Sequence, residues 1–258
     1  KLPEHKIVDG GYVLKLPDIP DEDLPHVSII TPTYNRRKLF PIAINNFENF
    51  IYPKDKLEWI IVDDTPEYIH TLDDILPRDP RIRYHLIESD RIMYISEKRN
   101  IAVSKASHNY IVHMDDDDYY PPESIMARVK TLIKYSKDGI RCVGSTSIGV
   151  YDIINNISSM SSDSPISLSE ASMAYTKDFW NERRFDNTAK VGEHKYFTET
   201  RLNQIIDIPY SFIIIAINHK NNFTAGLRSV TQNKIKNSSD NETANFFDTW
   251  DVETQIFM

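Results

Sequence analysis

The sequence predicts an α/β fold in which a mostly parallel central sheet is flanked by helices, with a smaller mixed or antiparallel part in the second half. Two observations support this prediction. Between residues 27 and 136, short apolar runs of strand length alternate with segments of helical character, which is the pattern of parallel sheets with crossover helices. Beyond residue 140, short apolar runs follow one another with few helices between them, so we expect mixed or antiparallel pairing there.

Four runs in the first half are predicted strands because each is short, mostly apolar, and bounded by charged or turn-forming residues. They cover residues 27–31, 58–62, 82–87 and 110–114. Helices are predicted at 38–50, where apolar residues recur at helical spacing, and at 96–107. Pro121 and Pro122 open a further helix, since proline is favoured in the first helical turn.

The second half and the two ends of the chain have weaker patterns. Strands are expected at residues 141–150, 153–157, 168–175, 205–208 and 211–217, and a helix at 193–202. Residues 1–26 contain four prolines and are predicted to form an irregular arm before a single domain at 27–245. The polar residues 228–245 favour a loop or lid, and the apolar positions within 246–258 favour a C-terminal helix that packs on the body.

Composition and charge argue against several classes of protein. The net charge of −8 over 258 residues disfavours nucleic acid and an anionic membrane surface as general partners. Cys142 is the single cysteine, so no internal disulfide forms, and we expect the cytoplasm or another reducing compartment. No apolar run is long enough to span a bilayer. Because the chain begins at Lys1 rather than at methionine, it is compatible with a fragment of a longer protein.

Acidic residues follow two of the predicted strands. Asp63 and Asp64 end the second strand, and Asp115–Asp118 follow the fourth. Ligands of open α/β sheets bind at the carboxyl ends of the strands, and short right-handed crossovers bring those ends to one edge. Four adjacent carboxylates repel one another unless a positive group lies among them. The pattern therefore predicts a Mg²⁺ or Mn²⁺ site for a phosphate-bearing substrate; the alternative is an acidic turn in water.

These blocks resemble, in their order and spacing, the inverting glycosyltransferases of family 2, which have the GT-A fold built on a Rossmann-like sheet. The resemblance rests on Val-Ser-Ile-Ile-Thr-Pro-Thr-Tyr-Asn-Arg at 27–36, Asp63-Asp64, Lys98-Arg99-Asn100 and Asp115–Asp118. Two later blocks extend it: Val191–His194, where the family's acidic motif usually reads Glu-Asp and this chain has Glu193-His194, and His219 with Asn222 and Thr224.

The resemblance implies a reaction. A hexose passes from a nucleotide sugar to an acceptor hydroxyl with inversion, and Mn²⁺ or Mg²⁺ is the metal. Residues 27–140 are the half expected to bind the nucleotide sugar, and 141–245 the acceptor half. Asp64 resembles the aspartate that binds a uracil NH, so a UDP-sugar is the expected donor, whereas the acceptor (glycan, protein, lipid or small molecule) stays open. The other donor-site candidates are Pro32, Thr33, Tyr34, Arg36, Arg99, Asp115 and Asp116.

The resemblance also implies the metal ligands and the base. Asp117 and His219 are the expected ligands, because carboxylate and neutral imidazole suit Mn²⁺. Glu193 is the expected general base, and His194 is the alternative because it replaces the usual aspartate. The expected acceptor or sugar pocket contains Trp180, Arg184 and His194.

Structural alternatives stay open for these residues. Asp64 also suits a turn, and Glu193 also suits the start of a helix. Tyr34 and Trp180 are also compatible with core positions, and Arg36 and Arg99 with surface ion pairs. His219 is also compatible with a core or a surface position. Asp118 is expected to cap the following helix. Two other functions also stay open: a nucleotidyltransferase of similar fold, although residues 31–36 lack the glycines of a phosphate loop, and a nucleotide-sugar-binding protein without turnover.

Overall fold

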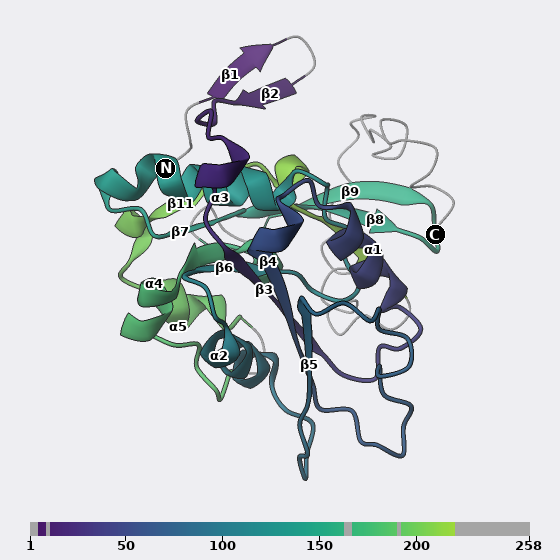
Figure 1. Ribbon diagram of the computed structural model, residues 1–258. Coiled ribbons are helices and arrows are strands. Elements are labelled where there is room, and N and C mark those ends of the chain that lie inside the picture. Colours follow the sequence, from purple (N-terminus) through teal and green to yellow (C-terminus); the bar gives the residue numbers. More distant parts are fainter. Residues whose placement is uncertain (1–4, 9–10, 163–166, 190–191, 220–258) are drawn as a thin grey trace.

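Seven strands form the central sheet of the computed structural model, which describes residues 5–8, 11–162, 167–189 and 192–219 (Figure 1). Four of them are parallel neighbours from the first half, in the order β6 (Tyr110–His113), β3 (Val27–Thr33), β4 (Leu57–Asp63) and β5 (Ile82–Leu86). Beyond β6 the sheet continues with β10 (Ala174–Thr176), β7 (Cys142–Gly144) and β11 (Ile205–Asp207). Since β10 is antiparallel to both of its neighbours, the predicted mostly parallel sheet with a mixed second half is confirmed.

A separate three-stranded sheet stands beside the central one. Its order is β12 (Ile215–Asn218), β8 (Ser147–Asp152) and β9 (Ile157–Ser162), with β12 parallel to β8 and β9 antiparallel to β8. Tyr119 and Ile215 form an isolated bridge between the segment after β6 and β12. The bridge places β12, and His219 after it, beside the acidic residues that follow β6.

Helices cover both faces of the central sheet (Figure 1). On one face, α1 (Pro41–Asn49) and α3 (Ser124–Tyr135) share a buried apolar cluster with Ile29 and Trp59. On the other face, α2 (Ile95–Lys105), α4 (Lys177–Glu182) and α5 (His194–Thr198) share one with Ile30 and Ile60. Neighbouring residues of a strand therefore point to opposite layers, as the pleat of a β-strand requires.

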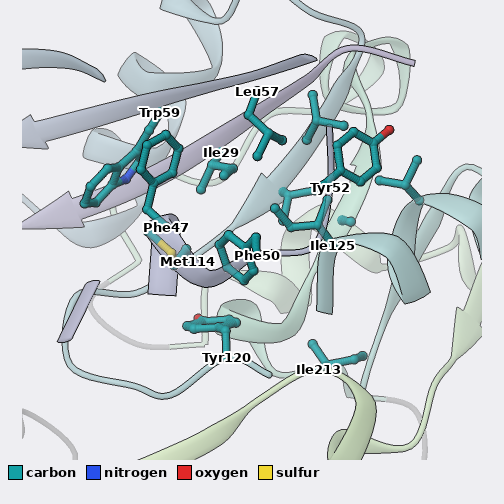
Figure 2. Packing of buried hydrophobic residues seen from close by; sticks show 14 of the residues in the cluster. Ile29, Phe47, Phe50, Tyr52, Leu57, Trp59, Met114, Tyr120, Ile125 and Ile213 are labelled. Carbon is teal, nitrogen blue, oxygen red and sulfur yellow. The ribbon is translucent and has the colours of Figure 1, made fainter. Parts of the chain in front are cut away.

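Aromatic packing and a buried hydrogen-bond chain fix the strand ends near the acidic residues. Figure 2 shows Phe47 of α1 against Trp59 of β4, with ring centroids 4.9 Å apart. Trp59 Nε1 donates to Thr31 Oγ1 at 2.8 Å, and Thr31 Oγ1 donates to the Met114 carbonyl at 2.6 Å. These bonds join β4, β3 and the segment after β6 in a place where water cannot replace them, because all three residues are buried.

Several predicted elements of the second half are shorter than expected or absent. Residues 153–156 of the strand expected at 153–157 form a turn that leads into β9 at Ile157, and Ile153 and Ile154 in this turn are exposed. Residues 141–150 divide into β7 and β8, and 168–175 contains the 3₁₀ turn Glu170–Ser172 before β10. The helix expected at 193–202 ends at Thr198, and Thr200 adopts a left-handed φ of 64° that does not continue a helix.

The N-terminal arm, expected to be irregular, contains an antiparallel hairpin of β1 (His5–Val8) and β2 (Gly11–Leu14). Figure 1 shows the hairpin standing away from the central sheet. The intervening sequence is Asp9-Gly10, a dipeptide that favours two-residue hairpin loops. The polar segment 228–245 and the C-terminal helix expected at 246–258 lie outside the described residues, as do Asn222 and Thr224. Within the described part of the chain, no helix is both long and apolar enough to cross a membrane.

Candidate active site

The carboxyl ends of β3, β4 and β6 lie at one edge of the central sheet, because the three strands are parallel neighbours. Thr33 ends β3, and its Oγ1 donates to Asp116 Oδ2 at 2.5 Å. Lys98 of α2 reaches the same edge, where its Nζ donates to the Thr33 carbonyl at 2.9 Å and to Asp64 Oδ1 at 2.8 Å. Side chains that follow three different strands are therefore joined through Thr33 and Lys98.

Asp116 and Asp117 face positively charged or imidazole groups. Arg36 Nη2 lies 3.5 Å from Asp117 Oδ2, and Arg36 Nε lies 3.9 Å from Asp116 Oδ1. His219 Nε2 lies 3.1 Å from the same Asp117 Oδ2. The fold thus brings together Asp117 and His219, which are 102 positions apart in the sequence.

Asp117 and His219 supply a carboxylate oxygen and an imidazole nitrogen, which are donors that suit Mn²⁺. No cluster of three or more His, Cys, Asp or Glu side chains that could hold a metal occurs in the part of the chain that the structure describes. Two protein donors fit a cation whose other ligands come from substrate phosphates and water, as is common for Mg²⁺. They do not fit a structural metal held by protein alone.

Asp118 has a different role from the one expected. Its Oδ1 accepts a hydrogen bond from the Ile217 backbone N–H at 3.0 Å. Helix α3 begins only at Ser124 and has no side-chain cap hydrogen bond, so the expected capping role is wrong. Asp118 instead fastens β12 to the acidic run, and this contact helps to place His219 beside Asp117.

Arg99 of α2 connects the acidic run with the Glu193 region. Its Nη2 donates to both oxygens of Asp115, at 2.9 and 3.1 Å, and its Nε lies 3.6 Å from Glu193 Oε1. Arg99 Nη1 lies 3.1 Å from Nδ1 of the buried His113. The guanidinium is 2% exposed, so Arg99 forms a buried ion-pair network and not the surface ion pair that was the alternative.

Glu193 and His194 stand at the start of α5 and have different partners. Glu193 has its closest charged neighbour in Arg99 and is 7% exposed at its side chain. His194 Nδ1 donates to Glu170 Oε1, and His194 Nε2 contacts Ser167 Oγ. His194 is therefore held between a carboxylate and a hydroxyl, whereas Glu193 is held beside a guanidinium.

The electrostatic environment raises the pKa of several of these groups. Burial, together with the charge of Asp117, raises the pKa of Asp116 to about 8. Burial raises the pKa of Glu193 to about 7 although Arg99 opposes the shift. Burial would lower the pKa of His194, but the hydrogen bond and charge of Glu170 outweigh it and raise that pKa. Buried carboxyl groups whose pKa lies near 7 are candidates for proton transfer.

The region expected to hold the nucleobase contains Asp64 and Tyr34. Asp64 is buried at the end of β4 and accepts hydrogen bonds from Lys98 Nζ and from the Met93 backbone N–H, at 2.8 and 2.5 Å. Lys98 Nζ also lies 5.8 Å from the centre of the Tyr34 ring. These contacts come from other segments, so Asp64 does not act as a turn-forming residue. The adjacent Asp63 has that role, because its Oδ1 accepts from the N–H and the hydroxyl of Thr65.

Trp180 and Arg184 lie farther along α4 and after it. Trp180 is buried in the apolar cluster on the α2 side, and its Nε1 donates to Asn100 Oδ1 at 2.8 Å. The guanidinium carbon of the exposed Arg184 lies 4.5 Å from the centre of the Trp180 ring. Trp180 therefore has the contacts of a core residue, which was the alternative to a pocket residue. Arg184 is the one of the two that is accessible to solvent.

Sequence reasoning missed three residues of this network: Lys98, His113 and Glu170. Lys98 belongs to the block Lys98-Arg99-Asn100, but the block does not indicate a separate role for it. His113 interrupts an apolar strand immediately before the acidic run, which is a usable signal for a buried polar contact. Glu170 lies in a serine-rich stretch without periodicity, and nothing local distinguishes it.

The comparisons with known proteins agree with this geometry. The family described as "Glycosyl transferase family 2" matches residues 28–198. A GalNAc(5)-diNAcBac-PP-undecaprenol beta-1,3-glucosyltransferase of Campylobacter jejuni is 30% identical over 118 residues, which cover 45% of this chain and 36% of that protein. An uncharacterized glycosyltransferase of Haemophilus influenzae is 25% identical over 114 residues, 43% of this chain and 44% of that protein. The matches thus span less than half the length of each curated relative.

Solved structures share the fold at low sequence identity. The mannosyltransferase PcManGT of Pyrobaculum calidifontis, in complex with GDP-Man and Mn²⁺, is 17% identical with a TM-score of 0.59, over 88% of this chain and 68% of that one. Residues 1–349 of S. aureus TarS, in complex with UDP-GlcNAc, are 15% identical with a TM-score of 0.57, over 84% of this chain and 68% of that one. Because the family match covers well over half of the 258 residues, the chain belongs to glycosyl transferase family 2, and its fold is that of the GT-A enzymes.

Proposed function

We propose that the protein transfers a sugar from a UDP-sugar to an acceptor hydroxyl, with inversion at the anomeric carbon and with Mn²⁺ or Mg²⁺ as the metal. The observation that carries this proposal is a continuous network. It runs from Asp117 through Arg36 to Asp116, and from there through Thr33 and Lys98 to Asp64. It lies at the edge of the sheet where open α/β folds bind ligands.

The second part of the network supports a reaction with an acceptor. Arg99 joins Asp115 to Glu193, so the acidic run and the acidic motif share one buried cation. Displacement of a nucleoside diphosphate needs stabilisation of the leaving group and a base for the attacking hydroxyl. Asp117 of the acidic run would meet the first need by holding the metal, and the Glu193–His194 pair would meet the second.

The donor's diphosphate fits beside Arg36 and Asp117. Arg36 lies within 3.5 Å of Asp117, and a guanidinium is well suited to bind phosphate oxygens. Asp117 and His219 would hold the metal, and a bound divalent cation would supply Lewis-acid stabilisation of the phosphoryl oxygens. Pro32 and Thr33 end β3 and Tyr34 follows it; these residues would line the nucleoside pocket, with Asp64 accepting from the uracil N–H.

Two relatives of known structure were solved with nucleotide sugars, one of them a UDP-sugar and the other GDP-Man. We favour UDP here because Asp64 is a carboxylate acceptor at the end of β4. A direct test incubates the protein with a panel of UDP- and GDP-sugars and Mn²⁺ and follows release of the free nucleoside diphosphate. We expect UDP release from at least one UDP-sugar, and loss of that release when EDTA is added.

The same test separates the other two functions. Exchange of pyrophosphate with UTP and a sugar phosphate would identify a nucleotidyltransferase. Tight binding of a UDP-sugar, measured by calorimetry, without UDP release for any acceptor in the panel would identify a protein without turnover.

A further inference from the structure

His194 is bonded through both of its ring nitrogens. Nδ1 contacts Glu170 Oε1, and the His194 backbone N–H donates to the same oxygen at 3.3 Å. A carboxylate only accepts hydrogen bonds, so Nδ1 carries a proton. In the neutral ring, Nε2 is then the unprotonated nitrogen, and it accepts from the Ser167 hydroxyl in contact with it. A neutral His194 therefore presents a lone pair to a hydroxyl group.

Glu170 is fixed by a turn that is tied to the acidic run. The Glu170 carbonyl accepts from the Met173 N–H at 3.2 Å and lies 2.7 Å from His113 Nδ1. The next residue, Ala171, accepts at its carbonyl from Tyr120 Oη at 3.0 Å. Tyr120 Oη in turn accepts from the Asp115 backbone N–H at 2.8 Å. The carboxylate that orients His194 is therefore positioned by the same segment that carries Asp115.

Glu193 is less suited to receive a proton from a substrate. Its nearest charged group is Arg99, at 3.6 Å, and Arg99 Nε has no hydrogen-bond partner among the described residues. Burial raises the pKa of Glu193 to about 7, yet its carboxylate lies 3.6 Å from a buried guanidinium, and a proton on Glu193 would leave that cation with one carboxylate partner fewer, which is costly. Glu193 is better explained as a counter-charge for Arg99.

We propose that His194 is the general base for the acceptor hydroxyl, that Glu170 is the residue that positions it, and that Ser167 Oγ marks where the acceptor hydroxyl lies. This inference rests on the proposed function. The acceptor's O–H proton passes to His194 Nε2 while the acceptor oxygen forms a bond to the anomeric carbon. The bond from that carbon to the diphosphate oxygen breaks, and its electron pair leaves with UDP. The imidazolium then releases its proton to water.

The charged groups around His194 make its imidazole a stronger base. Glu170, Glu193 and Lys195 are the charged groups that act on its ring; the two carboxylates raise its pKa, whereas Lys195 and burial lower it. Glu170 makes the largest of the favourable contributions. The acidic limb of the rate profile should therefore report His194 and should depend on the charge of Glu170.

The test measures UDP release in Mn²⁺ from the UDP-sugar that the wild-type protein turns over fastest, with water as the acceptor. We expect His194→Gln to lower kcat by about 10²–10⁴-fold with KM nearly unchanged. Glu170→Gln should lower kcat by a smaller factor and move the acidic limb of kcat/KM to lower pH. His108→Gln and Glu182→Gln are matched controls, because both residues lie outside the network, and they should keep the wild-type rate and pH profile.

Each other result has a definite meaning. Near-normal turnover of His194→Gln with a large loss in Glu193→Gln overturns the inference and leaves the proposed function standing. A wild-type protein that releases no UDP from any donor overturns the proposed function and the inference with it. An unchanged acidic limb in Glu170→Gln overturns the positioning role. Nitrogen-15 NMR of labelled histidine gives a check without turnover: a neutral His194 protonated on Nε2 also contradicts the inference.

Discussion

Arg99 Nε lies 3.6 Å from Glu193 Oε1, although 94 positions separate the two residues and each is almost completely buried. The other end of the same guanidinium holds Asp115 through two hydrogen bonds. A single side chain of α2 therefore connects the acidic run after β6 with the acidic motif at the start of α5. We infer that the relative position of the donor and acceptor parts of the site depends on this guanidinium.

The first prediction concerns the stability that this buried cation provides. Arg99→Met removes the positive charge and leaves Asp115 and Glu193 without it, so we expect the free energy of unfolding to fall by about 3–5 kcal/mol at neutral pH. Urea denaturation monitored by tryptophan fluorescence measures the change. Arg91→Met is the matched control, because the Arg91–Glu97 pair is exposed on the Arg91 side and exposed pairs contribute little. Equal losses in the two variants would contradict a special role for Arg99.

The second prediction concerns the metal ligands. Asp117→Asn removes the charged oxygen that His219 and Arg36 approach. We therefore expect the Mn²⁺-dependent gain in UDP affinity to fall at least about tenfold, which is about 1.4 kcal/mol. Isothermal titration calorimetry with and without Mn²⁺ measures it. Asp138→Asn, at an exposed position after α3, should bind as the wild type does. An Asp117→Asn protein with the full Mn²⁺-dependent affinity would remove Asp117 from the metal site.

The sequence was sufficient for the sheet and for its acidic edge. Residues 27–31, 58–62 and 110–114 are short apolar runs, the last two followed directly by aspartates. Burial between two helical layers keeps such runs in β3, β4 and β6. The meeting of Asp117 with His219 was anticipated from the order of the family's blocks. Periodicity alone could not have placed them together, because β12 reaches Asp117 through long-range bonds at Asp118 and Tyr119.

The sequence was insufficient where tertiary bonds decide the local structure. Residues 168–175 are apolar enough for a strand, yet Glu170–Ser172 turns because Tyr120 and His113 bind the carbonyls of Ala171 and Glu170. The local sequence therefore does not distinguish Glu170 from its neighbours. The apolar Ile153 and Ile154 suggest a strand, but they lie in an exposed turn. In this turn the backbone N–H groups of Ile154 and Asn155 donate to Asp152 Oδ1. A short apolar run does not by itself report burial.

The third prediction concerns the nucleobase. If Asp64 accepts from the uracil N–H, Asp64→Asn should weaken UDP binding by about tenfold or more, because hydrogen bonds to a charged acceptor contribute about 1.5–3 kcal/mol. Binding of pyrophosphate with Mn²⁺ should change little, since pyrophosphate has no base. Calorimetry with both ligands makes the comparison. Asp73→Asn, on an exposed turn, is the control for a generic loss of charge. A parallel loss of UDP and pyrophosphate affinity would show a structural effect and not base recognition.

The fourth prediction concerns the pH dependence of stability. Burial raises the pKa of Glu193 from 4.5 to about 7, so the folded protein binds a proton there that the unfolded chain has already lost between these values. The Glu193 contribution must therefore fall as pH rises through this window, by at most about 1.4 kcal/mol per pH unit. Glutamine does not titrate at position 193. The free energy of unfolding of Glu193→Gln, relative to that of the wild type, should therefore rise from pH 4.5 to 7 and stay constant above pH 7. Urea denaturation at a series of pH values measures both proteins. Glu182→Gln, at an exposed pair with Arg141, should show no such gain. A wild-type curve parallel to that of Glu193→Gln would mean that folding does not raise the pKa of Glu193.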